Sequence, residues 1–419
     1  MNNKINFSSE YFRGIISLFK GTFWAQLLGF LGTLLVAKLY GSNDFGVFSK
    51  FISLTTILSV FYTLRLESTL VLYNDKEKIR SLFSTAINIV FVVFLITLLF
   101  TFFIPESVFK HFNFLKIVVI ISIVGALIKA IENLYINYLI KEKKFKTIAN
   151  VKVLFTVTKY TLQICFFYID ITFGLIIGFL LATFTALLYL INKTKYNYKA
   201  PSLKRIKKHI TENKNLVSFG LLSDNLNIIN ITIIPILAGV FFEDSYIGWY
   251  YLSITILSIS LSFISSSFSK IFFLKVSNIY NTNKENIFVF IKKSTLYISL
   301  ILIIPLVIFT FWGDYFTFLF FDKNWGETGI YIKYLAFLFF LRSVYNPLSY
   351  LEEVYRKNHI GFLFNVYLLI VNIIVIYIGF LNKNFLMLVK YSSFLSSLGY
   401  VFMILYFLIL SKKISEEKI

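Results

Sequence analysis

Cysteine, histidine and charged residues are all scarce in this sequence. The one cysteine, Cys165, lies in an apolar run, which excludes a disulfide framework and a thiolate metal site. The three histidines, His111, His209 and His359, fall in or beside loops, which argues against a histidine proton relay inside a membrane. A Walker-type phosphate-binding motif is absent as well. The sequence therefore predicts no metal and no bound cofactor.

Charged residues make up 15% of the 419 residues, whereas a soluble globular domain carries about 25%. Hydrophobic residues make up 58% and aromatic residues 19% of the chain. Apolar runs of about 20 residues, long enough to cross a bilayer as a helix, recur throughout. They lie near 18–40, 44–64, 82–104, 116–139, 149–168, 171–191, 216–240, 246–268, 287–310, 330–350, 361–381 and 385–410. The chain is thus predicted to be an all-α integral membrane protein with about twelve transmembrane helices.

The polar residues 1–14 lack a small-residue cleavage site, so a removable signal peptide is not expected.

Lysine and arginine outnumber aspartate and glutamate by 41 to 21, which gives a formal net charge of +20. In a soluble protein this excess would suggest a nucleic-acid partner. Here 30 of the 41 basic residues fall in the two termini and one alternating set of loops, and eight fall in the other set. Because cytoplasmic loops carry the excess of lysine and arginine, both termini are predicted to be cytoplasmic, and no nucleic-acid partner is expected.

The longest connection, residues 192–215, divides the predicted helices into two sets of six. We therefore predict an N-terminal bundle over residues 1–200 and a C-terminal bundle over residues 201–419. With six helices in each, both bundles enter the membrane in the same direction, as in a parallel repeat. A weak internal echo between YGSNDFGVFS (40–49) and FFEDSYIGWYY (241–251) supports duplication. Each of these segments is followed by an apolar run that contains serine and threonine.

Four segments carry patterns that occur in the same order in a known family. Two of them are LLGFLGTLLVAKLYGSNDFGVFSKF (27–51), with its Asp-Phe-Gly, and LRLES (64–68), with its Arg-Leu-Glu. The others are KEKKFKTIANVKV (141–153) and LLSDNLNIINITIIPILAGVFFEDSYIGWYYL (221–252). Together they resemble the first helix, the end of the second helix, the fourth loop and the seventh helix of the oligosaccharide (O-antigen type) flippases. These flippases form part of the multidrug/oligosaccharidyl-lipid/polysaccharide exporter (MOP) superfamily.

This resemblance implies both a fold and an activity. The fold would be two six-helix bundles that form a V around a central cavity, as in the multidrug (MATE) transporters of the superfamily. The activity would be the transfer of an undecaprenyl-pyrophosphate-linked oligosaccharide, an O-antigen or capsule repeat unit, from the cytoplasmic to the outer leaflet of the bacterial inner membrane. The expected partners are the lipid-linked oligosaccharide, membrane lipids and other membrane proteins of polysaccharide assembly, and a monomer is expected.

Polar side chains inside the predicted spans are the first group of candidate site residues, because an intramembrane charge must face protein or water. Lys129 and Glu132 lie three residues apart on one helical face, so they either line a cavity or form a structural pair. Lys159, in the fifth span, is a further candidate. The remaining candidates for a polar cavity wall are Ser223, Asp224, Asn227, Asn230 and Asn346. Polar contacts between helices are the alternative for these side chains.

Basic residues at the cytoplasmic mouth are the second group. Arginine pairs bidentately with phosphate and lysine acts on it as a point charge, so a cationic rim suits a pyrophosphate head group. The candidates, together with an arginine inside the tenth span, are Lys20, Arg65, Lys270, Lys275 and Arg342. Ordinary anchoring by positive cytoplasmic loops is the alternative explanation.

Three carboxylates, Glu67, Glu132 and Asp224, are conceivable carriers for coupling to protons or sodium. A drug/cation antiporter of the same superfamily is the nearest alternative function, although the intramembrane charge is mostly basic. A major-facilitator transporter would show a Gly-x-x-x-Asp-Arg-x-Gly-Arg pattern where this chain reads LYNDKEKIRSLF (72–83). A polysaccharide polymerase would need a large outer loop, and the longest outer segment, 311–329, is short. The chain is therefore not expected to be an enzyme.

Overall fold

The computed structural model describes residues 9–416 except 71–72, 74, 112–114, 195, 197, 199–200, 203–205, 208, 210, 212–220, 283 and 322–324. Within these ranges the chain is helical and has no β-strand. It divides into two compact units. The first comprises Met1–Tyr40 and Val47–Ile228, and the second comprises Gly41–Gly46 and Ile229–Ile419. The bundle boundary predicted at residue 200 stays a prediction.

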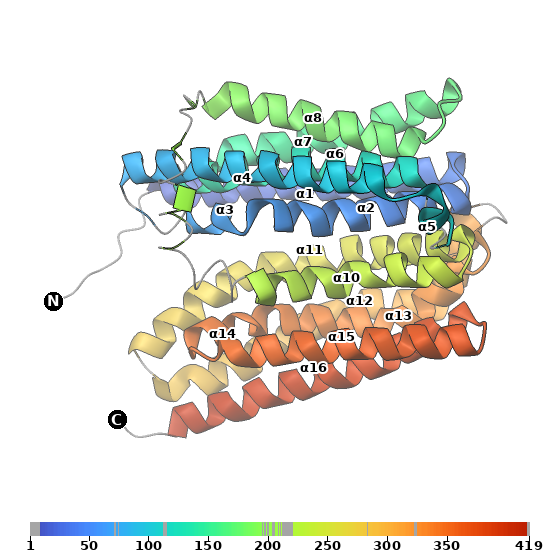
Figure 1. The fold of residues 1–419 in the computed structure, drawn as a ribbon. Helices are drawn as coiled ribbons and strands as arrows, with labels where there is room; N and C mark the ends of the chain where they lie inside the picture. The colour runs from blue at the N-terminus through green and yellow to red at the C-terminus, as the bar shows by residue number, and fades with distance from the viewer. Residues whose placement is uncertain are drawn as a thin grey trace. The chain divides into compact units, whose positions relative to one another are not determined.

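The first unit contains eight described helices, coloured blue to green in Figure 1. They are α1 (Ser9–Leu39), α2 (Ser42–Thr63), α3 (Leu66–Thr69), α4 (Lys76–Phe103), α5 (Glu106–His111), α6 (Lys116–Lys141), α7 (Phe145–Tyr168) and α8 (Gly174–Thr194). Helix α7 packs between α1 and α8, and α6 packs against α8 and α4. Side chains of α4 and α6 form much of a buried apolar core, in which the Phe83 and Tyr135 ring centroids lie 5.0 Å apart.

Two tyrosines that follow α8 pack back onto α4. The Tyr196 hydroxyl donates to the Arg80 carbonyl oxygen at 2.6 Å and lies 2.7 Å from the Ser84 hydroxyl. The Asn88 amide donates to the Tyr198 hydroxyl at 2.6 Å. The start of the long connection is therefore fixed to the first unit by hydrogen bonds.

The second unit holds the remaining helices, coloured yellow-green to red. They are α10 (Leu221–Phe241), α11 (Asp244–Thr282), the short 3-10 helix η2 (Lys284–Asn286), α12 (Ile287–Phe320), α13 (Thr328–Leu348), α14 (Tyr350–Val354), α15 (Asn358–Leu381) and α16 (Phe385–Glu416). The first residues of α10, up to Ile228, count with the first unit. Helix α13 packs against α11, α12 and α16, and α15 packs against α16.

Long helices occupy all twelve predicted span positions in the described chain. Eight of them, α1, α2, α4, α6, α8, α12, α15 and α16, are long and apolar enough to cross a membrane. The described residues of α7, α11 and α13 do not show this, and α10 is apolar over the shorter stretch Asn225–Phe241. The twelve-span count and the cytoplasmic termini therefore stay predictions. The finding supports a multi-pass membrane protein.

Several helices end in a left-handed residue that is not glycine. Lys143, Asp170, Arg356 and Lys383 have φ angles of 56°, 52°, 54° and 49°. At Lys383, the Asn384 N–H bonds the Gly379 carbonyl and the Lys383 N–H bonds the Phe380 carbonyl, each at 3.1 Å. This pair of bonds is the Schellman motif, in which glycine is the usual left-handed residue because it has no Cβ. Because charged residues occupy these positions, the helix ends could not be predicted from the positions of glycine.

Glycine matters at a close approach within the second unit. A Cβ added to Gly46 would lie 1.9 Å from the Asp244 carbonyl oxygen, and one added to Gly248 would lie 1.9 Å from the Ser42 carbonyl oxygen. The backbones meet there with no room for a side chain. These residues lie in the two segments whose sequences echo each other, so the echo coincides with a reciprocal contact.

Candidate functional site

Helix α6 carries an ion pair near its middle. The Lys129 ammonium nitrogen lies 2.8 Å from Oε2 of Glu132, one helical turn further along. Lys129 is about 18 Å from the C-terminal end of α6, at 1.5 Å per residue. The Glu132 side chain is 6% exposed, whereas the Lys129 side chain is 32% exposed. Because both partners belong to one helix, the pair does not join two helices, and the lysine is its more accessible member.

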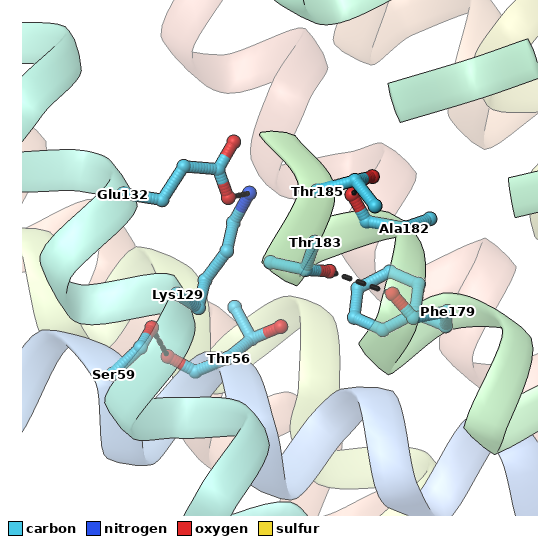
Figure 2. Close-up of polar contacts among 8 residues, drawn as sticks. All are labelled: Thr56, Ser59, Lys129, Glu132, Phe179, Ala182, Thr183 and Thr185. Atoms are coloured by element: carbon cyan, nitrogen blue, oxygen red, sulfur yellow. Dashed lines mark hydrogen bonds and ion pairs between the residues drawn. The ribbon is translucent and has the colours of Figure 1, made fainter. Parts of the chain in front are cut away.

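Residues with hydroxyl groups from two neighbouring helices lie around this ion pair. In Figure 2 the Lys129 side chain extends from α6 toward Glu132, opposite the two threonines of α8 and above Thr56 and Ser59 of α2. These six residues, called the polar cluster below, are Thr56, Ser59, Lys129, Glu132, Thr183 and Thr185. All of them belong to the first unit. The cluster also has an aromatic neighbour, because Lys129 Nζ lies 5.8 Å from the ring centroid of Phe155 on α7.

Each hydroxyl of the polar cluster donates its hydrogen to a carbonyl of its own helix. Thr56 donates to Ile52 at 2.7 Å and Ser59 donates to Thr56 at 2.8 Å. Thr183 donates to Phe179 at 2.8 Å and Thr185 donates to Ala182 at 2.9 Å. Such back-bonding is the usual way in which a helix satisfies an internal serine or threonine. The hydroxyl oxygens keep their lone pairs, so the half-buried Thr56 and Thr185 can act as acceptors toward a ligand, whereas Ser59 and Thr183 are only 2% and 1% exposed.

The position of Arg65 is determined by a strained break in the backbone directly after α2. Leu64 and Arg65 both have left-handed φ angles, 47° and 60°. For a residue with a Cβ this conformation costs roughly 1–2 kcal/mol. The following residues Leu66 and Leu70 are fully buried in the core, and the Arg65 N–H bonds the Thr63 hydroxyl at 3.3 Å. Buried neighbours therefore impose the break, and strained residues of this kind often lie at functional sites.

Lys159 is held at the contact between α1 and α7. Its Nζ lies 3.8 Å from the ring centroid of Tyr160, the distance of a cation–π contact. The Tyr160 hydroxyl lies 2.7 Å from the Thr33 hydroxyl on α1. A Cβ on Gly32 would lie 2.3 Å from the Tyr160 ring, so the ring fits only over a glycine. Gln163, one turn beyond Lys159, donates to the Leu175 carbonyl of α8 at 2.9 Å.

Two asparagines predicted to form a cavity wall make contacts between helices of the second unit. The Asn230 amide donates to the Asn365 carbonyl of α15 at 2.8 Å. The Asn346 amide donates to the Ser265 hydroxyl of α11 at 3.1 Å. These contacts are the alternative considered from the sequence, and a cavity-lining role for the two residues stays a prediction. Asn227, by contrast, is exposed.

The remaining residues predicted for the site either lie apart from the polar cluster or have side chains outside the described part of the structure. Arg342 lies 5.9 Å from the ring centroid of Phe339, and Lys275 is exposed. Glu67 is half-buried in α3. The side chains of Lys20, Ser223, Asp224 and Lys270 lie outside the described part of the structure. Of the predicted site residues that are described, Lys129 and Glu132 are in direct contact.

Sequence reasoning missed the hydroxyl side of the polar cluster. The SLTTILS run (53–59) contains Thr56 and Ser59, but its serines and threonines suggested only an internal repeat. Thr183 and Thr185 stand in an otherwise apolar helix without a distinctive pattern. Lys50 was among the eight basic residues counted with the second set of loops, although it falls within the predicted span 44–64. It lies inside α2 and is 3% exposed.

Comparison of the sequence with known protein families identifies the family of the chain. The model of the family described as "Polysaccharide biosynthesis protein" matches residues 35–329. No curated protein matches the sequence.

Solved structures share the fold at low sequence identity. The lipid II flippase MurJ, in an inward closed conformation, is 14% identical, with a TM-score of 0.78 over 96% of this chain and 91% of that one. An inward-facing multidrug resistance MATE family transporter of the MOP superfamily is 13% identical, with a TM-score of 0.72 over 94% and 96%. At such identities the likeness concerns the fold, and the family match covers more than half of the chain. The chain therefore belongs to the polysaccharide biosynthesis protein family, with the fold of the MOP superfamily, as its motifs indicated.

Proposed function

We propose that the protein moves an undecaprenyl-pyrophosphate-linked oligosaccharide, an O-antigen or capsule repeat unit, to the outer leaflet of the bacterial inner membrane by alternating access. The observation that carries this proposal is the polar cluster halfway along α6, in a chain of the polysaccharide biosynthesis family. A charge at this depth is costly unless it faces protein or water. A polar head group that crosses the membrane needs such a site.

The chemistry of the polar cluster suits a phosphorylated sugar. Lys129 supplies a positive charge for phosphate oxygens, and the hydroxyl oxygens of the half-buried Thr56 and Thr185 accept hydrogen bonds from sugar hydroxyls. Glu132 neutralises Lys129 while no substrate is bound. Entry of a phosphate, or protonation of Glu132, would release the lysine, which gives a simple route to coupling with protons. Sodium coupling is the other route, and Glu67 and Asp224 remain candidate carriers beside Glu132.

An inside-negative membrane potential favours this direction of transport. Outward movement of one negative charge gains about 2.3 kcal/mol per 100 mV. An anionic head group can therefore be exported without ATP, while its polyprenyl tail stays in the lipid. Arg65, Lys20, Lys270 and Lys275 would attract the pyrophosphate at the cytoplasmic mouth, and Arg342 would contact it deeper in the second unit.

Deletion of the gene in its native host tests the proposal. We expect lipid-linked single repeat units to accumulate in the inner leaflet, and plasmid-borne wild-type protein to clear them. K129Q should fail to complement although it reaches the membrane, whereas K146Q, which removes an exposed lysine at the start of α7, should complement fully. Unpolymerised units on the outer face of the deletion strain would instead identify a polymerase and refute a flippase.

A drug/cation antiporter is the second candidate, because acceptor oxygens beside the buried Glu132 would also suit an organic cation. Efflux of a cationic dye from cells that overproduce the protein distinguishes the two. Dye efflux that depends on Glu132, with no change in lipid-linked oligosaccharide, would favour the antiporter.

A further inference from the structure

A cavity of about 250 Å³ lies in the second unit between α13 and α16. Its walls come from Tyr334 and Phe337 of α13 and from one side of α16. The α16 residues are Lys390, Ser393, Phe394, Ser397, Leu398 and Val401. None of the residues that line the cavity belongs to the polar cluster, and the inference below does not depend on the proposed function.

The cavity has a cationic end and an apolar length. Lys390 Nζ lies 4.7 Å from the ring centroid of Tyr334, at the end of the cavity nearest the start of α16. The α16 residues that line the cavity, from Lys390 to Val401, form a stripe about 16 Å long along the helix. This is close to the depth of one leaflet, since the whole hydrocarbon core is about 30 Å thick. The exposed rings of Phe337 on α13 and Phe394 on α16 make this length apolar.

A buried hydroxyl in the cavity wall lacks a partner. Ser397 is 5% exposed, and its hydroxyl makes no hydrogen bond within the described part of the chain. The other serine of the wall, Ser393, donates to the Tyr334 carbonyl oxygen across the helix pair. A buried hydroxyl without a partner costs roughly 1–3 kcal/mol. Ser397 is therefore placed to hydrogen-bond a molecule that occupies the cavity.

We infer that this cavity is a binding site for an anionic phospholipid. The phosphate lies at Lys390, an ester carbonyl accepts a hydrogen bond from Ser397, and one acyl chain lies along Phe394, Leu398 and Val401. A lysine on the exposed side of a membrane helix otherwise has to extend to the interface to keep its charge hydrated. A lipid phosphate satisfies the charge at its own depth. Because both helices begin at the predicted outer face, the lipid belongs to the outer leaflet.

Native mass spectrometry of the full-length protein in detergent tests this site. The probes are phosphatidylglycerol and phosphatidylcholine with identical acyl chains. Wild-type protein should retain phosphatidylglycerol in preference. K390Q should weaken phosphatidylglycerol binding about five-fold, the equivalent of about 1 kcal/mol for one lysine near a lipid surface, and should leave phosphatidylcholine unchanged. K383Q, which removes an exposed lysine just before α16 but outside the cavity, is the matched control and should bind like wild type.

Two further variants separate the cavity from the charge. S397L fills the cavity and should reduce binding of both lipids, while S397A removes only the hydroxyl and should weaken both lipids without changing the preference between them. If S397L does not fold, S397A and K390Q still decide the question. Equal losses in K390Q and K383Q would overturn the inference. So would undecaprenyl phosphate displacing phosphatidylglycerol in a Lys390-dependent way, because the site would then belong to the polyprenyl lipid.

Discussion

The Tyr345 hydroxyl donates a hydrogen bond of 2.6 Å to Oε1 of Glu352, which joins the end of α13 to the short helix α14. The other carboxylate oxygen, Oε2, occupies the space that a Cβ on Gly361 would fill, 1.8 Å from that position. Burial raises the pKa of the Glu352 carboxyl above its ordinary value of 4.5, and the hydrogen bond from Tyr345 offsets part of the rise. Glu352 thus links the stability of this helix junction to pH.

The first prediction concerns E352Q. Because the folded-state pKa of Glu352 lies above the unfolded value, the folded protein binds more protons between these two pKa values. Stability contributed by this group therefore falls as the pH rises through that window, and the loss is complete above the folded pKa. The glutamine variant lacks this dependence. Melting temperatures in detergent between pH 4.5 and pH 8 should decline less for E352Q than for wild type. E353Q alters the exposed neighbouring carboxylate and should follow the wild-type curve.

A second prediction separates the structural and binding roles of Lys129 and Glu132. K129Q leaves the buried carboxylate unpaired and should lower the free energy of unfolding by about 3 kcal/mol, the low end for a broken buried pair because Lys129 is partly exposed. E132Q leaves the more accessible lysine and should cost less. The double variant K129Q/E132Q should regain stability near that of wild type.

Transport by these three variants gives the decisive comparison. If Lys129 binds the head group, E132Q should retain flipping, whereas K129Q and the stable double variant should lose it. A double variant that flips at the wild-type rate would show that the pair is only structural. Complementation of the deletion strain, normalised to the amount of protein in the membrane, measures this outcome.

The third prediction concerns the contact between α1 and α7. G32A would place a methyl group within 2.3 Å of the Tyr160 ring, so the ring has to move or the helices have to separate. Overpacking of this kind costs about 1–3 kcal/mol. G29A, one turn earlier, would place its methyl group 3.9 Å from Thr156 Cγ2, an ordinary contact. Thermal unfolding should therefore show a clear loss for G32A and almost none for G29A, and equal effects would contradict the tight approach.

A fourth prediction is a gain in stability. Lys383 holds a left-handed conformation that costs roughly 1–2 kcal/mol for a residue with a Cβ. K383G removes this strain at the expense of about 0.5–1 kcal/mol of chain entropy, so we expect a net gain of about 0.5–1 kcal/mol. N382G changes the preceding residue, which has a φ angle of −87° and bonds the Ile378 carbonyl through its side chain, and should destabilise the protein. Chemical unfolding of the two variants should give shifts of opposite sign.

The sequence could predict features set by neighbouring residues, but not those set by contacts between residues far apart in the chain. The spacing of Lys129 and Glu132 was enough to place them on one helical face, because three residues nearly complete a turn. The left-handed break at Leu64 and Arg65 could not be predicted, since neither residue favours it and the buried leucines that follow impose it. The partner of Asn230 could not be predicted either, because Asn365 is 135 residues away and the packing of α15 against α10 decides the contact.

The four hydroxyls of the polar cluster have a consequence for the range of sugars that the proposed function would allow. Their hydrogens are already committed to helix carbonyls, so these hydroxyls would offer the proposed glycan only lone pairs, beside the ammonium of Lys129. Lone pairs accept an axial OH as readily as an equatorial one. If the proposed function holds, such acceptors would bind sugars of different stereochemistry, which would give a physical basis for tolerance of varied repeat units.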